Sequence, residues 1–325
     1  MAVVGRVPAD YSDRLELRLD PRMRADAALK LILRPLLGTM EANRPWIADH
    51  PDPEFLHDFR VAVRRARAAL GQLKGLIPDG VRGRRRGEFA WLGAVTGEPR
   101  DLDVYLEEFP TLARLLPARE RAALEPLREH LTRARADAYR ELAAALGGSR
   151  YRRLVVGLEA FLEQPLPARP RSPHALRPVR EYAADRIWRA YRKLLRHGAR
   201  ITDQSPPEQL HELRKEAKKL RYLLEFFAGL FPPGKVRRAL KALKRLQDNL
   251  GAYQDVHVQQ TFLRERAGRL AAGLEDPTPA LLALGMLIER LERRARACRA
   301  EFVRRFAAFA SPEEQARYRR LFHPS

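Results

Sequence analysis

The sequence predicts an all-α protein made of two similar halves, and three observations carry that prediction. Apolar residues recur at spacings of three and four along most of the 325-residue chain, which is typical of amphipathic helices. Alanine, leucine, arginine and glutamate, which favour helices, are abundant, whereas the alternating pattern of strands is nearly absent. A basic segment also returns 154 residues further along the chain. Together these features indicate an internally duplicated helical protein.

The repeat begins at residues 55–70, FLHDFRVAVRRARAAL, which return at 209–224 as QLHELRKEAKKLRYLL. The same shift of 154 carries Gly97 onto Gly251 and Asp101 onto Asp255. Further on, the sequence RYRRL at 150–154 returns at 317–321 with a different offset. A constant shift over roughly 45 residues is the sequence signature of a repeat, so we interpret the chain as a duplication.

Proline and glycine gather between the helical segments and suggest where the halves are joined. The densest break is 164–178, QPLPARPRSPHALRP, whose five prolines predict an extended linker. The expected organisation is an N-terminal extension at 1–20, a first repeat at 21–163, the linker at 164–178 and a second repeat at 179–323.

The charge balance predicts the kind of partner. Lys and Arg number 62 against 41 Asp and Glu, which gives a formal net charge of +21. Such an excess favours tight, salt-sensitive binding to a strongly negative molecule. An arginine-rich genome would explain the number of cations but not their positions along the helices.

Other features exclude several classes of protein. The single cysteine, Cys298, excludes a disulfide framework and a multi-thiolate metal site. The N-terminal residues lack the apolar core of a signal peptide, and no stretch approaches 18 uncharged apolar residues. The expectation is therefore a soluble, cytoplasmic protein without a membrane span.

The repeated segment forms a helix with an apolar stripe and a cationic stripe. On a helix over 57–74, Phe59, Val63, Ala66, Leu70 and Leu73 share one face, as in a packed bundle. The opposite face carries His57, Arg60, Arg64, Arg67 and Lys74, and in the second copy His211, Arg214, Lys218 and Arg221. Like charges three and four residues apart repel by about 0.2–0.5 kcal/mol per pair. We therefore predict a row held for an anion, the alternative being a merely solvated face.

Other residues could bind the same anion. The two histidines begin equivalent helices on the cationic stripe, which favours a donor role. Metal binding is not expected, because no acid or second histidine was assigned to ligand spacing on either helix. Further cations lie in the next helical segments and either line the same groove or lie outside it: Arg84, Arg238, Lys241, Lys244 and Arg245.

Catalytic and nucleotide motifs are weak. The segment from Gly229 to Lys235 has nearly the spacing of a P-loop, but Pro232 and Pro233 remove backbone N–H donors, so an interhelical turn is expected. No nucleophile–base arrangement stands out, and we expect neither an enzyme nor a cofactor. The runner-up is a nucleic-acid-binding protein, which would need aromatic residues among the cations; only Tyr222 lies near them.

The paired motifs resemble a known family. The repeated His-x-x-Arg-x-x-x-(Arg/Lys)-(Arg/Lys)-x-Arg is followed by Leu-Gly-Ala-Tyr-Gln-Asp-Val at 250–256 and by a less regular Gly-Glu-Pro-Arg-Asp-Leu-Asp-Val at 97–104. This combination resembles the CHAD domain, the conserved histidine α-helical domain, over nearly the whole chain after residue 20. Many relatives also carry a CYTH hydrolase barrel, and only Glu16-Leu17-Arg18 hints at such a strand here.

The resemblance implies a fold and a function. It implies two four-helix bundles related by a pseudo-twofold axis, whose basic helices face a central cavity or groove. It also implies binding of inorganic polyphosphate there, with phosphate or sulfate ions in the same groove, and association with polyphosphate granules. Matched by motif position, the binding residues are His57, Arg60, Arg64, Arg67, His211, Arg214, Lys218 and Arg221, with Arg65 and Lys219 at the flank of the stripes.

Overall fold

The computed structural model describes residues 17–49 and 52–323. All regular elements within these ranges are helices, which confirms the predicted all-α class; the one strand-like feature is an isolated bridge between Arg24 and Pro178. None of the described helices is both long enough and apolar enough to cross a membrane. Most of the expected extension 1–20, including Glu16, lies outside the described residues, and residues 17–20 form no helix.

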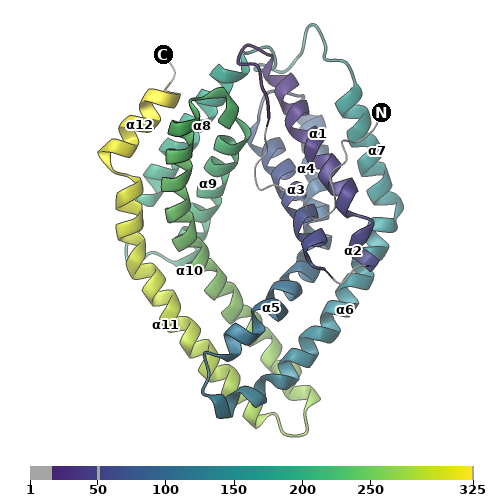
Figure 1. Ribbon diagram of the computed structural model, residues 1–325, viewed down its shortest axis with the longest axis vertical. Coiled ribbons are helices and arrows are strands. Elements are labelled where there is room, and N and C mark those ends of the chain that lie inside the picture. The colour runs from purple at the N-terminus through teal and green to yellow at the C-terminus, as the bar shows by residue number, and fades with distance from the viewer. Residues whose placement is uncertain (1–16, 50–51, 324–325) are drawn as a thin grey trace.

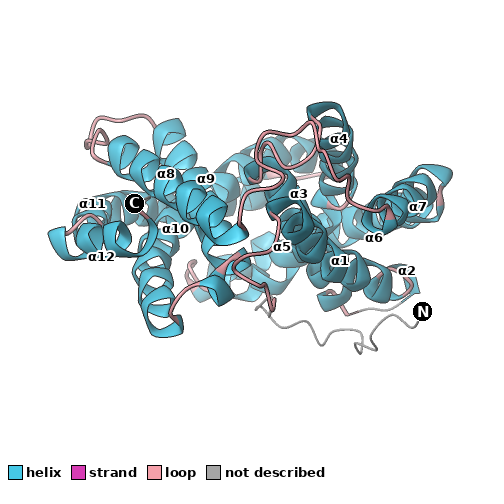
Figure 2. Ribbon diagram, turned by 90° about the horizontal axis from the view of Figure 1, so that it is seen from above, coloured by secondary structure: helices cyan, strands magenta, loops and turns pink. Residues whose placement is uncertain are grey.

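The helices form two columns that approach each other at both ends of the long axis (Figure 1). The first column contains α1 (Ala25–Asn43), α2 (Trp46–Asp49), α3 (Glu54–Gln72), α4 (Asp79–Val95), α5 (Gly97–Ala113), η1 (Ala118–Leu124), α6 (Glu125–Gly147) and α7 (Ser149–Glu163). The second contains α8 (Val179–Gly198), α9 (Pro207–Phe226), η2 (Ala228–Leu230), α10 (Pro233–Gly273), α11 (Thr278–Phe309) and α12 (Pro312–Phe322). Figure 2 shows from above that α8 and α9 lie between α12 and the first column.

The apolar stripes of α3 and α9 are buried as their spacing predicts. In α3, Phe59, Ala66 and Leu70 are at most 1% exposed, and the equivalent residues of α9 are buried to the same degree. Helix α3 ends at Gln72, two residues before the predicted end, because the chain turns at Gly75 with a φ of 73°. A side chain at this position would be strained by the positive φ, so glycine sets the end of the helix.

Residues 164–178 contain no helix, as their prolines predict, but they are packed onto the protein. Ala175 is fully buried, and the His174 amide donates a hydrogen bond to the Gly75 carbonyl at 2.9 Å. The Lys30 ammonium donates to the carbonyl of Gln164. The segment is therefore a fixed strap between the columns rather than a free spacer.

The segment with P-loop-like spacing is a turn between helices. Its residues form η2 and the first turn of α10, which begins at Pro233. The residues before Gly234 form a helix rather than the strand that precedes a P-loop, which agrees with the expected interhelical turn.

The two columns touch in three zones. Where α1 and α8 begin, the Ala25 amide donates to the Arg177 carbonyl and the Val179 amide donates to the Met23 carbonyl, both at 2.9 Å. These two hydrogen bonds tie the start of each column to the segment that precedes the other.

The other two zones lie further along the columns. Between α3 and α9, Arg65 forms an ion pair with Glu225 at 3.4 Å. At the far end, the ring of Tyr105 on α5 stacks on Phe262 of α10 with centroids 3.6 Å apart. Beside this stack, the Gln259 amide donates to the Glu108 carboxylate at 3.0 Å.

Candidate functional site

The first arginine of each repeated motif is held against the Gly-containing segment that follows it. Arg60 Nη1 donates to Thr96 Oγ1 at 2.9 Å, and a Cβ at Gly97 would stand only 3.9 Å from the same nitrogen. In the second column, Arg214 pairs with Asp255 at 3.3 Å and lies 4.0 Å from the place of a Cβ at Gly251. Each guanidinium therefore lies in van der Waals range of the helix that follows, at equivalent positions of the two columns.

The environment of Arg60 is partly dehydrated. Burial lowers the pKa of Arg60, and the nearby Asp101 carboxylate acts in the opposite direction. The surrounding protein likewise raises the pKa of Asp101, although its side chain remains accessible, while Arg60 lowers it. Arginine keeps its charge under such conditions, so Arg60 and Asp101 hold opposite charges near each other at one end of the cationic row.

The cationic rows of α3 and α9 meet at Arg64 and Lys218. Burial first, and then the positive charges of Arg214 and Arg64, lower the pKa of Lys218 to about 8. Arg64 belongs to the first column and Lys218 to the second, so the field of one row acts directly on the other. An excess of positive charge is therefore concentrated where the two rows face each other.

A groove of about 600 Å³ opens beside α9 and is bounded by α5, α10 and α11. The predicted cations Arg214, Lys218 and Arg221 line it together with Arg294. Three carboxylates also line it, and two of them are neutralised: Asp255 by Arg214 and Asp248 by Lys244, at 2.8 Å. The groove can thus offer guanidinium and ammonium donors to an anion.

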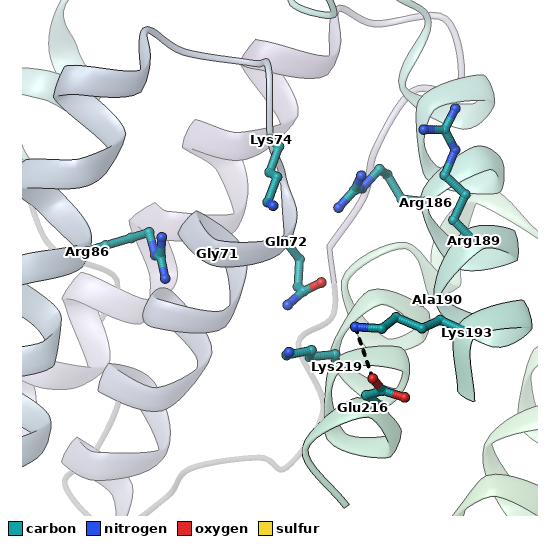
Figure 3. Close-up of a pocket in the computed structure, with 10 residues that line it drawn as sticks. All are labelled: Gly71, Gln72, Lys74, Arg86, Arg186, Arg189, Ala190, Lys193, Glu216 and Lys219. Carbon is teal, nitrogen blue, oxygen red and sulfur yellow. Dashed lines mark ion pairs between the residues drawn. The ribbon is translucent and has the colours of Figure 1, made fainter. Parts of the chain in front are cut away.

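A second cavity, of about 360 Å³, lies between the columns on the other side of α9 (Figure 3). Its lining includes Lys219, which sequence analysis placed at the flank of the stripe, and Gly71 of α3. Glu216 is the one carboxylate of this lining, and it contacts Lys193 at 3.0 Å and His197 at 2.9 Å. Four further cations of the lining have no carboxylate partner among the described residues: Lys74, Arg86, Arg186 and Lys219.

Arg65 lies in a different environment from the other motif residues. Its side chain is only 3% exposed and pairs with Glu225, which also accepts from Arg221 at 2.5 Å. The helical wheel placed Arg65 at the edge of the cationic stripe, whereas the structure places it inside the contact between α3 and α9. Its guanidinium therefore joins the two columns.

The two histidines have different neighbours. His211 Nδ1 lies 2.6 Å from Gln254 Oε1 on α10. His57 lies with Glu54 and Asp58 in a group whose ligand atoms are all within 4.8 Å of one another. The expectation that no acid stands at ligand spacing from His57 was therefore wrong, because Glu54 precedes it by one helical turn. No ion is needed to explain this group, since carboxylates commonly cluster at the start of a helix.

The additional cations of α4 and α10 divide into two groups. Lys244 pairs with Asp248 on the wall of the groove beside α9. The other four are exposed and line neither of the two cavities just described: Arg84, Arg238, Lys241 and Arg245. Sequence reasoning missed Arg186 and Arg294, because their approach to the cavities depends on how α8 and α11 pack.

These features define an all-helical protein in which cationic helix faces gather where two helical columns meet. The chain belongs to the CHAD domain family, which it matches over residues 31–264. Among solved structures it is similar to the CHAD domain from the plant Ricinus communis, with 27% identity and a TM-score of 0.75 over 94% of this chain and 98% of that one.

A second solved structure, PptA from Streptomyces chartreusis, has a similar fold. It shares 22% identity at a TM-score of 0.59 over 87% of this chain and 99% of that chain. No curated protein matches the sequence significantly.

Proposed function

We propose that this protein binds inorganic polyphosphate along the facing cationic rows of α3 and α9 and that it acts by binding rather than by catalysis. The observation that carries this proposal is the effect of Arg64 on Lys218: burial lowers the pKa of the lysine most, and positive charges from both columns, Arg214 and Arg64, lower it further. Such crowding is unfavourable without an anion, and a phosphate chain relieves it at several points at once.

The proposal includes an internal duplication with pseudo-twofold symmetry, and the contacts between the columns support it. A twofold arrangement requires that if residue i contacts j, the equivalent of i contacts the equivalent of j. At the shift of 154, Tyr105 and Phe262 correspond to Gln259 and Glu108, and both pairs are in contact. The same shift relates the two hydrogen bonds at the starts of α1 and α8.

In the proposed binding mode the anion lies next to the pseudo-twofold axis. Arg64 and Lys218 are equivalent at the shift of 154, and the charge of Arg64 acts on Lys218, which supports a position near that axis for both. On each side the rows continue one turn further, through Arg60 and Arg67 on α3 and through Arg214 and Arg221 on α9. A chain of repeated phosphates fits a row of this kind because every unit presents the same charge to every cation.

Polyphosphate accounts for the lining better than nucleic acid does. The groove beside α9 is lined by cations, carboxylates and small or aliphatic residues, with no aromatic residue among them. Base stacking therefore has no platform there. The CHAD family is linked to polyphosphate binding, which agrees with this chemistry. Phosphate and sulfate ions would occupy the same donors, and residence on polyphosphate granules would follow from binding.

Two triple variants test the proposal. Replacing Arg60, Arg64 and Arg67 together by glutamine should weaken polyphosphate binding by several kcal/mol, at about 1.5–3 kcal/mol per charge-assisted hydrogen bond. Replacing Arg214, Lys218 and Arg221 should weaken it comparably, because one chain would contact both rows. The measurement is titration with polyphosphate of defined length, with DNA of equal charge as competitor.

A matched control removes three cations elsewhere. Arg119, Arg140 and Arg304 have side chains 85%, 79% and 78% exposed, and their replacement by glutamine changes the net charge equally. This control should bind polyphosphate nearly as the wild type does. Equal weakening in all three variants would show that net charge alone drives binding, and DNA that outcompetes polyphosphate would contradict the assignment of the ligand. Release of phosphate on incubation would contradict the non-catalytic role.

A further inference from the structure

A third hollow, which the proposed function does not use, lies between α8 and α12. It has a volume of about 750 Å³ and is lined by side chains from both helices. The α8 residues that line it, including Trp188 and Arg192, lie on the opposite face of that helix from Arg186 and Lys193, which line the cavity between the columns. We call it the α8–α12 groove.

The charge of this groove is uniform. Four arginines line it, two from each helix, and no carboxylate is among its lining residues: Arg192, Arg196, Arg319 and Arg320. None of the four is in an ion pair or hydrogen bond with a side chain among the described residues. This distinguishes them from the neighbouring Arg317, which pairs with Glu314, and from Arg304, which pairs with Glu301. The groove therefore holds uncompensated guanidinium groups that suit phosphate oxygens.

One end of the groove is aromatic. The indole of Trp188 lies 5.3 Å from the ring of His323, edge to face, where the end of α12 passes α8. Tyr191, which also lines the groove, stacks on the buried Tyr318 with ring centroids 3.7 Å apart. The groove thus combines a stacking surface and a row of cations.

The spacing of residues along α8 places the aromatic ring and the arginines in a row. Trp188, Arg192 and Arg196 follow one another at intervals of four residues, so they lie on one face. At a rise of about 1.5 Å per residue, Arg196 lies about 12 Å along the axis from Trp188. A planar base at Trp188 would therefore place an extended phosphate chain over the two arginines that follow.

The equivalent place in the first column differs on one of its two helices. At the shift of 154, Trp188, Arg192 and Arg196 correspond to Arg34, Gly38 and Ala42 of α1. Arg34 donates to the Leu162 carbonyl at 3.3 Å. Arg319 and Arg320 correspond to Arg152 and Arg153 of α7, so the α8 side of the groove is particular to the second column and the α12 side is shared.

We propose that the α8–α12 groove binds a nucleoside polyphosphate, with the base stacked on Trp188 and the phosphates held by Arg192, Arg196, Arg319 and Arg320. A single tryptophan provides a platform for one base, which favours a mononucleotide over a strand that stacks several bases in succession. The arginine row favours a nucleotide with two or three phosphates over a monophosphate. This site is independent of the polyphosphate rows on α3 and α9.

Calorimetric titration of the full-length protein with ATP, AMP and inorganic tripolyphosphate tests the site. ATP should bind at least tenfold more tightly than AMP, which lacks the chain, and ATP binding should depend on Trp188, whereas tripolyphosphate, which lacks the base and also suits the rows of α3 and α9, should bind independently of Trp188. Trp188→Leu should weaken ATP binding about tenfold, in the range expected for loss of one base–aromatic stack, and leave tripolyphosphate binding unchanged. Trp188→Phe keeps an aromatic platform and should retain ATP binding within threefold.

The arginines are tested with a charge-matched pair of variants. Arg192→Gln with Arg319→Gln should weaken ATP binding more than tenfold, whereas Arg140→Gln with Arg304→Gln should leave it within twofold. Binding of long polyphosphate should persist in every one of these variants. The proposal is overturned if ATP does not bind the wild type, if ATP binding does not depend on Trp188, or if the arginine variants of the groove bind ATP normally. It is also overturned if single-stranded DNA binds the groove while ATP does not.

Discussion

Arg65 of α3 reaches Glu225 of α9 across the contact between the columns, with 3.4 Å between Nη2 and Oε2. The two side chains are 3% and 14% exposed, so this is a nearly dry ion pair that fixes one column against the other. It lies one residue from Arg64, which we propose binds polyphosphate, whereas Arg65 joins the two columns.

Removing Arg65 should destabilise the fold rather than empty the binding site. Arg65→Ala leaves a buried carboxylate with only Arg221 as a partner, and we expect a loss of about 3 kcal/mol in the free energy of unfolding. The combined change Arg65→Met with Glu225→Leu should recover most of that loss, because it removes both buried charges. Urea unfolding followed by circular dichroism measures both variants. A stable Arg65→Ala protein that no longer binds polyphosphate would instead make Arg65 a ligand.

Polyphosphate binding should depend on pH through Lys218. Its pKa is held near 8 by burial and by the charges of Arg214 and Arg64, and a bound polyanion would raise it again. Binding should therefore take up protons above about pH 8, and affinity should fall as the pH rises through that range. Calorimetry in buffers of different ionisation enthalpy reports the uptake. Lys218→Arg keeps its charge and should remove this part of the pH dependence.

Lys218 should also make the stability of the unliganded protein depend on pH. The folded pKa of about 8 lies below the ordinary lysine value of 10.5, so between these two pH values the unfolded chain holds a proton that the folded chain has lost. The contribution of Lys218 to stability therefore increases as the pH rises through this window. Unfolding measured from neutral to alkaline pH should show a smaller increase for Lys218→Met than for the wild type. Identical profiles would mean that Lys218 is fully hydrated.

Affinity for polyphosphate should fall steeply with salt. Six motif cations contact the chain in the proposed mode, and release of condensed counterions at about 0.7 per contact gives a slope of about −4 in log K against log salt. Either triple variant of the cationic rows should reduce the magnitude of the slope by about 2. Fluorescence anisotropy with labelled polyphosphate over a range of salt concentrations measures it. A flat plot would show that contacts other than charge dominate.

Two glycine substitutions should have opposite effects on stability. Gly75 has a φ of 73°, and a Cβ there would stand 2.8 Å from His174 Cδ2, so Gly75→Ala should destabilise by about 1–3 kcal/mol. Gly87 lies within α4 with no atom near a Cβ, so Gly87→Ala should stabilise by about 0.5–1 kcal/mol through helix propensity. Thermal unfolding of both variants measures these changes in stability. Equal effects would mean that the turn at Gly75 adapts.

Local periodicity was enough to predict the helices and both faces of α3 and α9. The apolar residues of those faces are buried, because spacing along one helix determines which side chains point the same way. It could not predict what each face meets. Arg65 and Lys219 occupy equivalent motif positions, and yet the first is buried against Glu225 and the second lines a cavity.

The reason for this difference lies on the partner helix. At the shift of 154, Glu225 corresponds to Gly71, which lines the same cavity as Lys219. Where the first contact has a carboxylate, the equivalent contact has no side chain, and an open space remains beside an uncompensated lysine (Figure 3). A repeat search aligns such positions but cannot show that they face each other.

The exchanged hydrogen bonds between the starts of α1 and α8 have a consequence for the origin of the chain. Each column has its first helix completed by backbone from the other, through Ala25 to Arg177 and through Val179 to Met23. Under the proposed duplication, these donors of a single-copy ancestor would have been satisfied by solvent or by pairing with a second copy of itself. The contact has the reciprocal form of an isologous dimer interface. Fusion of two genes would then have turned a concentration-dependent association into an intramolecular one. The two halves could afterwards diverge, as they do at Gly71, which corresponds to Glu225, and at the α8–α12 groove.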